Sequence, residues 1–182
     1  MNKINEIDLN KKILKMDLLR ILKKEAYRIS INDIMKASAF LREDSKYMPK
    51  KYREDYIKKF TVAFFSRLRE LKNDKTDYEG YINNKKLKEM LKVLKIQEKE
   101  AFIRNDKNEL SFIKISKIIP IYTTFIKEES IHPVGTSFPG GFRLEYMDGK
   151  YLCPVKDKQS KTPHALCRFC VSVQDDRVKD FI

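Results

Sequence analysis

The chain has 182 residues, of which 42% are apolar and 36% charged, and its formal net charge is +13. This composition excludes a disordered chain, which would hold fewer aromatic residues, and a disulfide-stapled secreted domain, which would be shorter and richer in cysteine. The longest apolar stretch, residues 118–126, is interrupted by Pro120 and is too short to span a bilayer. The first residues carry no signal-peptide pattern. We therefore expect a soluble cytoplasmic protein with reduced thiols and no membrane contact.

The composition changes near residue 130. Residues 130–182 hold all three cysteines, both histidines, four of the six prolines and four of the five glycines. They carry only eight basic and six acidic side chains, so nearly all of the excess positive charge lies in residues 1–129. This contrast predicts two parts, a basic helical body over 1–129 and a small Cys/His module over 130–182 that packs on it.

The spacing of apolar residues predicts helices throughout the first part. The first runs from Asp8, as its N-cap, to Arg28, and the second begins at Ser30, where Asp33 completes a capping box. A third follows Pro49 with the strongest apolar stripe in the chain. Asn84 is expected to cap a shorter fourth helix.

A last helix is expected from about Glu109 to Glu128, kinked or divided at Pro120. The residues just before it allow another interpretation. Within 101–113, two short apolar runs flank a polar turn, so a hairpin is an open alternative there.

The second part has the pattern of a strand pair. Residues 142–146 alternate apolar and charged, and Asp148-Gly149 separates them from residues 151–153, which predicts a tight hairpin turn. Before it, Gly140-Gly141 supplies the backbone freedom for a rigid turn. After it, Thr162-Pro163 predicts the start of a short helix that carries Cys167 and Cys170.

The cysteines are the strongest chemical signal. Cys153, Cys167 and Cys170 have the spacing C-x13-C-x2-C, and thiolates from a strand end and one helical face could converge on one metal. His132 and His164 are alternative fourth ligands. Three cysteines and a histidine suit zinc, and three cysteines with a non-cysteine fourth position also suit a [4Fe–4S] cluster. Two other interpretations stay open, namely buried structural thiols and a redox dithiol.

The loop that begins at His132 is a second candidate site. Its glycines match no phosphate-binding motif, and no nucleophile elbow or acid–base pair is visible, so an enzyme at the loop is the weakest hypothesis. A pocket there would be lined by Gly135, Thr136, Phe138, Gly140 and Gly141.

The positive charge suggests a polyanionic partner. The residues that we would assign to RNA or ribosome binding are Lys50, Lys51, Arg53, Lys58, Lys59, Lys85, Lys86 and Lys88. An acidic protein partner would use the same electrostatics. A solvated helix face explains these lysines equally well, and no known RNA-binding signature is present.

Three strings near the C-terminal end carry a family resemblance. They are HPVGTSFPGG over 132–141, YLCPVK over 151–156 and ALCRFC over 165–170. Together they resemble an uncharacterised archaeal family found mainly in methanogens, with no activity assigned. The resemblance implies an anaerobic cytoplasm, brings an iron–sulfur cluster to near parity with zinc, and favours His132 over His164 because His132 belongs to the first string.

These observations predict a mainly α fold with a C-terminal hairpin and short helix. The function that they favour is a metal-binding accessory protein of archaeal metabolism, more a binding protein than an enzyme. The alternative is a basic RNA- or ribosome-associated protein.

Overall fold

The structure is a computed structural model that describes residues 3–138 and 140–181. Its α-helices are α1 (Lys15–Tyr27), α2 (Ile31–Asp44), α3 (Lys50–Asn73), α4 (Asn84–Arg104), α5 (Lys107–Ser116), α6 (Ile119–Ile121) and α7 (Lys156–Ser160). A π-helix follows α6 over Tyr122–Lys127, and short 3-10 helices cover Lys3–Glu6, Ser45–Tyr47, Leu166–Phe169 and Asp176–Phe181. The strands are β1 (Glu145–Met147), β2 (Lys150–Cys153) and β3 (Val173–Gln174). The prediction of a mainly α fold is confirmed.

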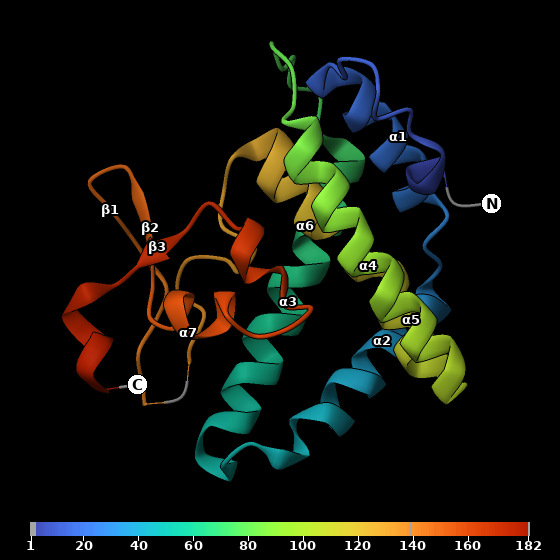
Figure 1. The fold of residues 1–182 in the computed structure, drawn as a ribbon. Coiled ribbons are helices and arrows are strands. Elements are labelled where there is room, and N and C mark those ends of the chain that lie inside the picture. Colours follow the sequence, from blue (N-terminus) through green and yellow to red (C-terminus); the bar gives the residue numbers. More distant parts are fainter. Residues whose placement is uncertain (1–2, 139, 182) are drawn as a thin grey trace.

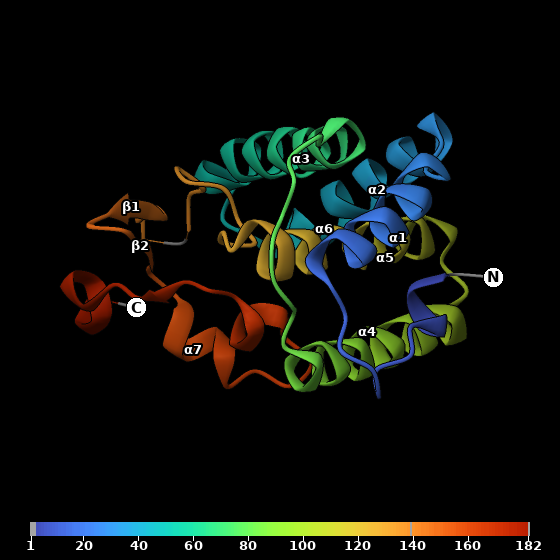
Figure 2. The same ribbon diagram turned by 90° about the horizontal axis from the view of Figure 1, so that it is seen from above.

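The helices form layers around one large apolar core. In Figures 1 and 2, α6 lies between α3 on one side and α4 on the other, and the strands lie at the end of these layers away from the N-terminus. Helix α2 packs most extensively against α5. Leu18, Leu22, Leu87, Met90 and Leu94 are fully buried in this core. None of the helices in the described part of the chain is both long and apolar enough to cross a membrane.

Polar side chains fix several helix starts. The capping box is confirmed, since the Ser30 hydroxyl accepts from the Asp33 amide and the Asp33 carboxylate accepts from the Ser30 amide. The fourth helix begins as expected but is capped by Asn83, whose side chain accepts from the Lys86 amide at 2.9 Å. The side-chain amide of Asn84 instead donates to the carbonyl of Leu9, so the prediction of Asn84 as the cap is wrong.

The start of α1 also corrects the sequence prediction. Asp8 does not cap a helix, because residues 8–14 form a turn and then an extended segment. Leu14 pairs with Tyr81 in an antiparallel bridge, and the Ile82 amide donates to the Ile13 carbonyl at 3.0 Å. Backbone pairing with a distant segment therefore holds these residues extended, although their apolar spacing fits a helix.

The region around residues 101–128 is helical, so the alternative hairpin at 101–113 is wrong. Asn105, with φ of +54°, ends α4, and the Asp106 carboxylate then accepts from the amides of Asn108 and Glu109 to start α5. The expected division near Pro120 is confirmed. The π-helix that follows ends at Glu128, whose φ is +53°.

The C-terminal hairpin is confirmed, with β1 and β2 antiparallel in the register Tyr146↔Tyr151. Asp148 and Gly149 both have positive φ, as a primed turn requires. Strand β3, which we did not predict, pairs with β2 in parallel and sets Gln174 opposite Cys153. Its two residues are too few for a sequence pattern.

The prediction of a helix that starts at Thr162-Pro163 is wrong in both the position and the type of the helix. His164 has φ of +61°, which interrupts helical backbone, and its carbonyl accepts from the Gln97 side chain of α4 at 2.9 Å. Only the 3-10 helix Leu166–Phe169 follows, and Cys170 is extended. Phe169 is buried in the large core, so this segment is anchored to the helices.

A buried carboxylate joins three parts of the body. Asp74 accepts hydrogen bonds from the hydroxyls of Tyr122, at 2.7 Å, and Tyr78, at 2.9 Å, and from the Thr76 amide. Burial alone would raise the pKa of Asp74, but these hydrogen bonds outweigh it and hold that pKa below its ordinary value. Tyr122 is fully buried, so its hydroxyl depends on this partner.

We expect Tyr122→Phe to lower the free energy of unfolding by about 1–3 kcal/mol at neutral pH, since it removes a buried hydrogen bond to a charged group. Tyr78→Phe is the matched control, because it removes a less buried donor from the same carboxylate. It should lower the free energy of unfolding by less than Tyr122→Phe does. The charged Asp74 contributes its full stabilisation above the ordinary pKa of an aspartate, and this stabilisation is lost as pH falls through the lowered pKa of the folded protein. The difference in unfolding free energy between Tyr122→Phe and wild type should therefore become smaller in acid. Denaturant unfolding at several pH values measures this, and an equal cost for both variants would contradict it.

Candidate functional site

Cys153, Cys167 and Cys170 come from two short elements at the edge of the helical body. Cys153 ends β2, where its carbonyl accepts from the Asp175 amide at 3.1 Å. Cys167 lies in the 3-10 helix, and the Cys170 amide closes the turn by donating to the Cys167 carbonyl at 3.1 Å. Cys153 is buried, and the other two cysteines are partly buried. All three are free thiols.

The three cysteines and His132 line one cavity of about 230 Å³ between the helices and the C-terminal segment. We call it the thiol cavity. Most of its remaining wall is apolar, with Phe60 and Phe64 from α3 and Phe112 from α5. Cys153, Cys167 and His132 also line an adjoining cavity of about 340 Å³ on the side of Tyr56 and Met48. The chain thus brings together, from three segments, the four side chains that the sequence analysis selected.

His132 is held between aromatic rings. Its ring centroid lies 5.6 Å from that of Phe60 and 5.5 Å from that of Phe138. Burial lowers the pKa of His132 to about 4, so its imidazole is neutral at neutral pH, the form that binds metals. The other candidate, His164, lines neither cavity and points its Nδ1 toward Glu100, 3.6 Å away.

A positive charge lies beside the thiols. The Lys156 ammonium donates to the carbonyls of Cys167 and Cys170, which fixes it at the cavity wall. Burial raises the pKa of Cys153 to about 11 and also raises that of Cys167, while the Lys156 charge opposes both shifts. Lys86 is partly buried near Lys156 and Cys170, and burial lowers its pKa. The cavity therefore holds Cys153 and Cys167 as neutral thiols, with the Lys156 ammonium beside them.

The Cys170 sulfur has two polar neighbours. The Ile131 amide donates to it at 3.3 Å, and the Ser172 hydroxyl lies 3.2 Å from it. As the side chains stand, no three His, Cys, Asp or Glu residues within 3–138 and 140–181 form a group that could hold a metal ion. The four candidate donors thus line one cavity without forming such a group.

The predicted pocket loop folds back on the strand that follows it. The Gly135 amide donates to the Leu144 carbonyl at 2.8 Å, and the Phe138 amide to that of Phe142 at 2.8 Å. Gly140 has φ of +91°, and a Cβ there would lie 2.7 Å from the Phe142 ring, so the turn requires glycine. Gly141 also has positive φ. Pro139 of the motif lies outside the described residues.

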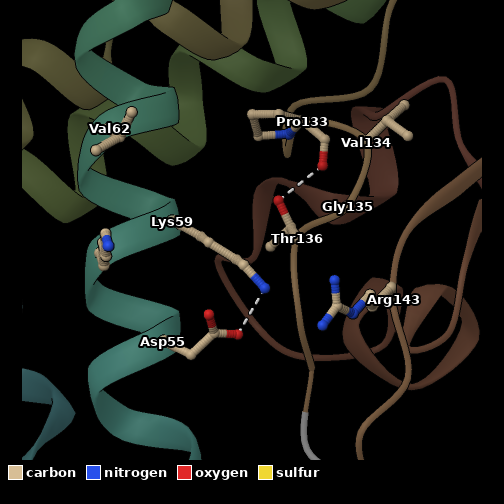
Figure 3. Close-up of a pocket in the computed structure, with 9 residues that line it drawn as sticks. Asp55, Lys59, Val62, Pro133, Val134, Gly135, Thr136 and Arg143 are labelled. Atoms are coloured by element: carbon tan, nitrogen blue, oxygen red, sulfur yellow. Dashed lines mark hydrogen bonds and ion pairs between the residues drawn. The ribbon is translucent and has the colours of Figure 1, made fainter.

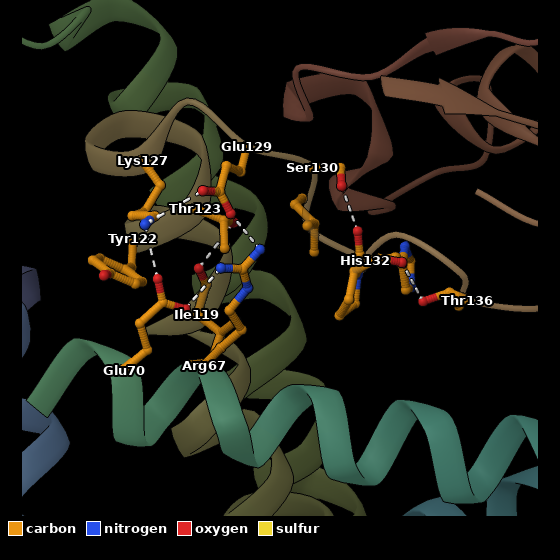
Figure 4. A network of polar contacts seen from close by, with 12 residues as sticks. Arg67, Glu70, Ile119, Tyr122, Thr123, Lys127, Glu129, Ser130, His132 and Thr136 are labelled. Carbon is orange, nitrogen blue, oxygen red and sulfur yellow. Dashed lines mark hydrogen bonds and ion pairs between the residues drawn. The ribbon is translucent and has the colours of Figure 1, made fainter. Parts of the chain in front are cut away.

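An ion network fixes the chain just before this loop. Arg67 of α3 pairs with Glu70, at 2.7 Å, and with Glu129, and Lys127 pairs with both carboxylates (Figure 4). Burial alone would lower the pKa of Arg67, but the two carboxylates raise it. The Ser130 hydroxyl then donates to the His132 carbonyl. These contacts set the direction in which the chain carries His132 to the thiol cavity.

The other face of the loop borders a second, larger space. An open cleft of about 450 Å³ separates α3 from the loop and is lined by Asp55, Lys58, Lys59, Val62, Pro133, Val134, Gly135, Thr136 and Arg143 (Figure 3). Of the predicted pocket residues, Gly135 and Thr136 thus line this cleft. Phe138 instead packs with Leu144, Cys153 and Val155 in a small apolar cluster. Lys58 and Lys59, which we predicted as nucleic-acid contacts, lie on the cleft wall.

Comparison with known proteins identifies the relatives of this fold. Residues 14–175 match the model of a family described as "uncharacterized protein conserved in archaea" (DUF2115). The chain belongs to this archaeal family. A UPF0305 protein of Methanothermobacter thermautotrophicus is 50% identical over 160 residues, covering 88% of this chain and 96% of the relative. A UPF0305 protein of Methanocaldococcus jannaschii is 35% identical over 166 residues, covering 90% and 98%. No solved structure matches.

The resemblance to a methanogen family is thereby confirmed, and it extends beyond the C-terminal motifs. The matched range includes helices α1 to α6 as well as the cysteines. The matched range therefore covers both the helical body and the segments that line the thiol cavity.

The predicted basic residues of this DUF2115 protein divide into several groups. Lys50, Lys85 and Lys88 are exposed, whereas Lys86 is partly buried and lines a different pocket beside Tyr81 and Glu128. Arg53 donates to the carbonyls of Lys46 and Met48 at the start of α3. The side chain of Lys51 lies outside the described residues. The predicted set is thus not one continuous surface.

We expect the metal-free protein to lose stability as pH falls from 6.5 to 4, because the unfolded chain binds a proton at residue 132 that the folded chain excludes. His132→Gln removes this difference in proton binding. Between pH 6.5 and 4, the free energy of unfolding of the variant should therefore fall by about 2–3 kcal/mol less than that of wild type. His164→Gln is the matched control and should keep the wild-type pH dependence. Urea unfolding at stepped pH measures all three, and parallel curves for wild type and His132→Gln would contradict the burial of a neutral imidazole.

Proposed function

We propose that this archaeal protein binds a metal centre in the thiol cavity, through Cys153, Cys167, Cys170 and His132. The observation that carries the proposal is that these side chains, distant in sequence, line one cavity. Three thiolates and a neutral imidazole are a common donor set for zinc, and three thiolates with a fourth, different ligand also suit a [4Fe–4S] cluster. The protein then acts as a metal-binding accessory protein rather than as an enzyme in its own right.

Metal binding here requires the thiols to lose their protons and turn toward a common centre. A metal replaces the protons, which removes the cost that raises the thiol pKa values in its absence. The Ile131 amide already donates to the Cys170 sulfur, and such N–H···S contacts stabilise thiolates. The Lys156 ammonium offsets the net negative charge that three thiolates give to a zinc or iron–sulfur centre. These two contacts partly offset the burial that favours the neutral thiols.

The first test is the metal content of protein purified without oxygen, together with its absorption spectrum. About four irons per chain with a broad band near 400 nm would identify a cluster, and about one colourless zinc per chain a zinc site. Cys167→Ser should lose most of the metal. His132→Gln should lose part of it, and His164→Gln should keep it. Wild-type protein without metal would contradict the proposal.

The same variant tests whether the metal stabilises the C-terminal segment. This segment has a small apolar cluster of its own, so we expect Cys167→Ser to expose residues 130–182 to protease while the helices persist. Limited proteolysis with mass spectrometry locates the cuts. Unchanged resistance of that segment would reject a structural metal.

A second candidate function rests on helix α4. Its exposed lysines recur at intervals of three and four residues, so they share one face about 21 Å long: Lys85, Lys88, Lys92, Lys95 and Lys99. Among the described residues none of the five has an ion-pair partner. We propose that this lysine stripe contacts the phosphates of RNA.

The salt dependence of RNA binding tests the stripe. We assume that the stripe contacts four or five phosphates of a single-stranded RNA. A plot of the logarithm of the binding constant against the logarithm of the salt concentration should then have a slope near −3. Lys88→Gln/Lys92→Gln should reduce the slope by about 1.4, whereas Lys24→Gln/Lys75→Gln, at exposed positions outside α4, should leave it unchanged. Filter binding over a range of potassium chloride measures the slopes, and equal effects of the two pairs would rule out a dedicated stripe.

A further inference from the structure

The open cleft between α3 and the 133–136 loop has a wall that is charged at one end and apolar at the other. Asp55, Lys58, Lys59 and Val62 are spaced i, i+3, i+4 and i+7, so one face of α3 supplies all four. Figure 3 shows the polar ends of Asp55, Lys59 and Arg143 gathered at one end, with Val62 and Pro133 at the other. The volume of about 450 Å³ is that of a small-molecule site rather than of a polymer groove.

The charged end carries an excess of positive charge. The Asp55 carboxylate pairs with the Lys59 ammonium, at 2.7 Å, and accepts a hydrogen bond from the Ser137 hydroxyl, at 2.9 Å. Within the described part of the chain, the Lys58 and Arg143 side chains have no ion-pair or hydrogen-bond partner. Two cations therefore remain for an external anion after the internal pair is formed.

The apolar end is open to solvent. Val62 is 63% exposed on α3, and Val134 is 55% exposed on the loop that faces it. Pro133 lines the same end and carries no donor on its backbone nitrogen. Exposed apolar side chains on both walls of one cleft would gain from an apolar group placed between them.

We propose that the cleft binds an amphipathic organic anion, in which a phosphate or carboxylate group is attached to a small apolar body. Lys58 and Arg143 hold the anionic group, Lys59 adds a third donor while keeping Asp55 in place, and Val62 and Val134 contact the body. The hydrogen bond from the Thr136 hydroxyl to the Pro133 carbonyl, at 2.7 Å, keeps the loop wall in shape. This site is separate from the thiol cavity and does not depend on a metal.

Titration with phenyl phosphate, benzoate and inorganic phosphate, followed by amide chemical shifts, tests the proposal on the whole protein. Phenyl phosphate or benzoate should shift the Gly135 and Thr136 amides and saturate, whereas inorganic phosphate should bind at least tenfold more weakly because it lacks the apolar body. Whichever aromatic anion binds more tightly tells whether the cleft prefers phosphate or carboxylate.

Variants on exposed positions separate specific contacts from general charge. Lys58→Gln or Arg143→Gln should each weaken phenyl phosphate binding about tenfold, since each removes a charge-assisted contact. Val62→Ser should weaken phenyl phosphate but leave inorganic phosphate unchanged. Lys85→Gln on α4 has the same change of net charge and should have no effect. The proposal fails if Lys85→Gln weakens binding as much as Arg143→Gln, or if inorganic phosphate binds as tightly as phenyl phosphate.

Discussion

The arrangement of both cavities depends on the ion pairs that Arg67 makes with Glu70 of its own helix and Glu129 of the segment that leaves the π-helix. The Arg67 side chain is only 16% exposed, so these contacts are partly shielded from water and from salt. They hold the chain where Glu128, in the left-handed region, turns it away from the helical core. Four residues after Glu128, His132 reaches the thiol cavity. This anchor fixes where the loop begins relative to α3, and the hydrogen bond between Ser137 and Asp55 holds the loop farther along.

Local signals in the sequence were enough to predict much of the fold. Ser30 with Asp33 defines the start of α2, and Asp148-Gly149 defines the hairpin, because each depends on residues within four positions. The start of α1 could not be predicted in this way, since it is set by pairing between Leu14 and Tyr81 across 67 positions. The helix expected after Thr162 failed for a similar reason. Gln97 on α4 holds the His164 carbonyl in a left-handed turn that no local pattern reveals.

The candidate site was predictable in its residue types but not in its surroundings. The rarity of cysteine and histidine in the chain was sufficient to select Cys153, Cys167 and Cys170 with two alternative histidines, and the family resemblance then favoured His132. The role of Lys156 was missed, because its contacts with the carbonyls of Cys167 and Cys170 depend on the fold of the segment between them. Only the loop side of the cleft was predicted, through Gly135 and Thr136, because Lys58 and Lys59 look like members of a solvated helix face until Arg143 is placed opposite them.

The loop that begins at His132 is the common wall of the two cavities. His132 itself faces the thiol cavity, and the next four residues line the cleft. Ser137 ties the loop to Asp55 on α3, while Phe138 packs with Cys153. A ligand in the cleft and a metal held by His132 would therefore both contact this one loop. If the two sites are coupled through it, linkage requires the effect of each on the other to be equal in both directions.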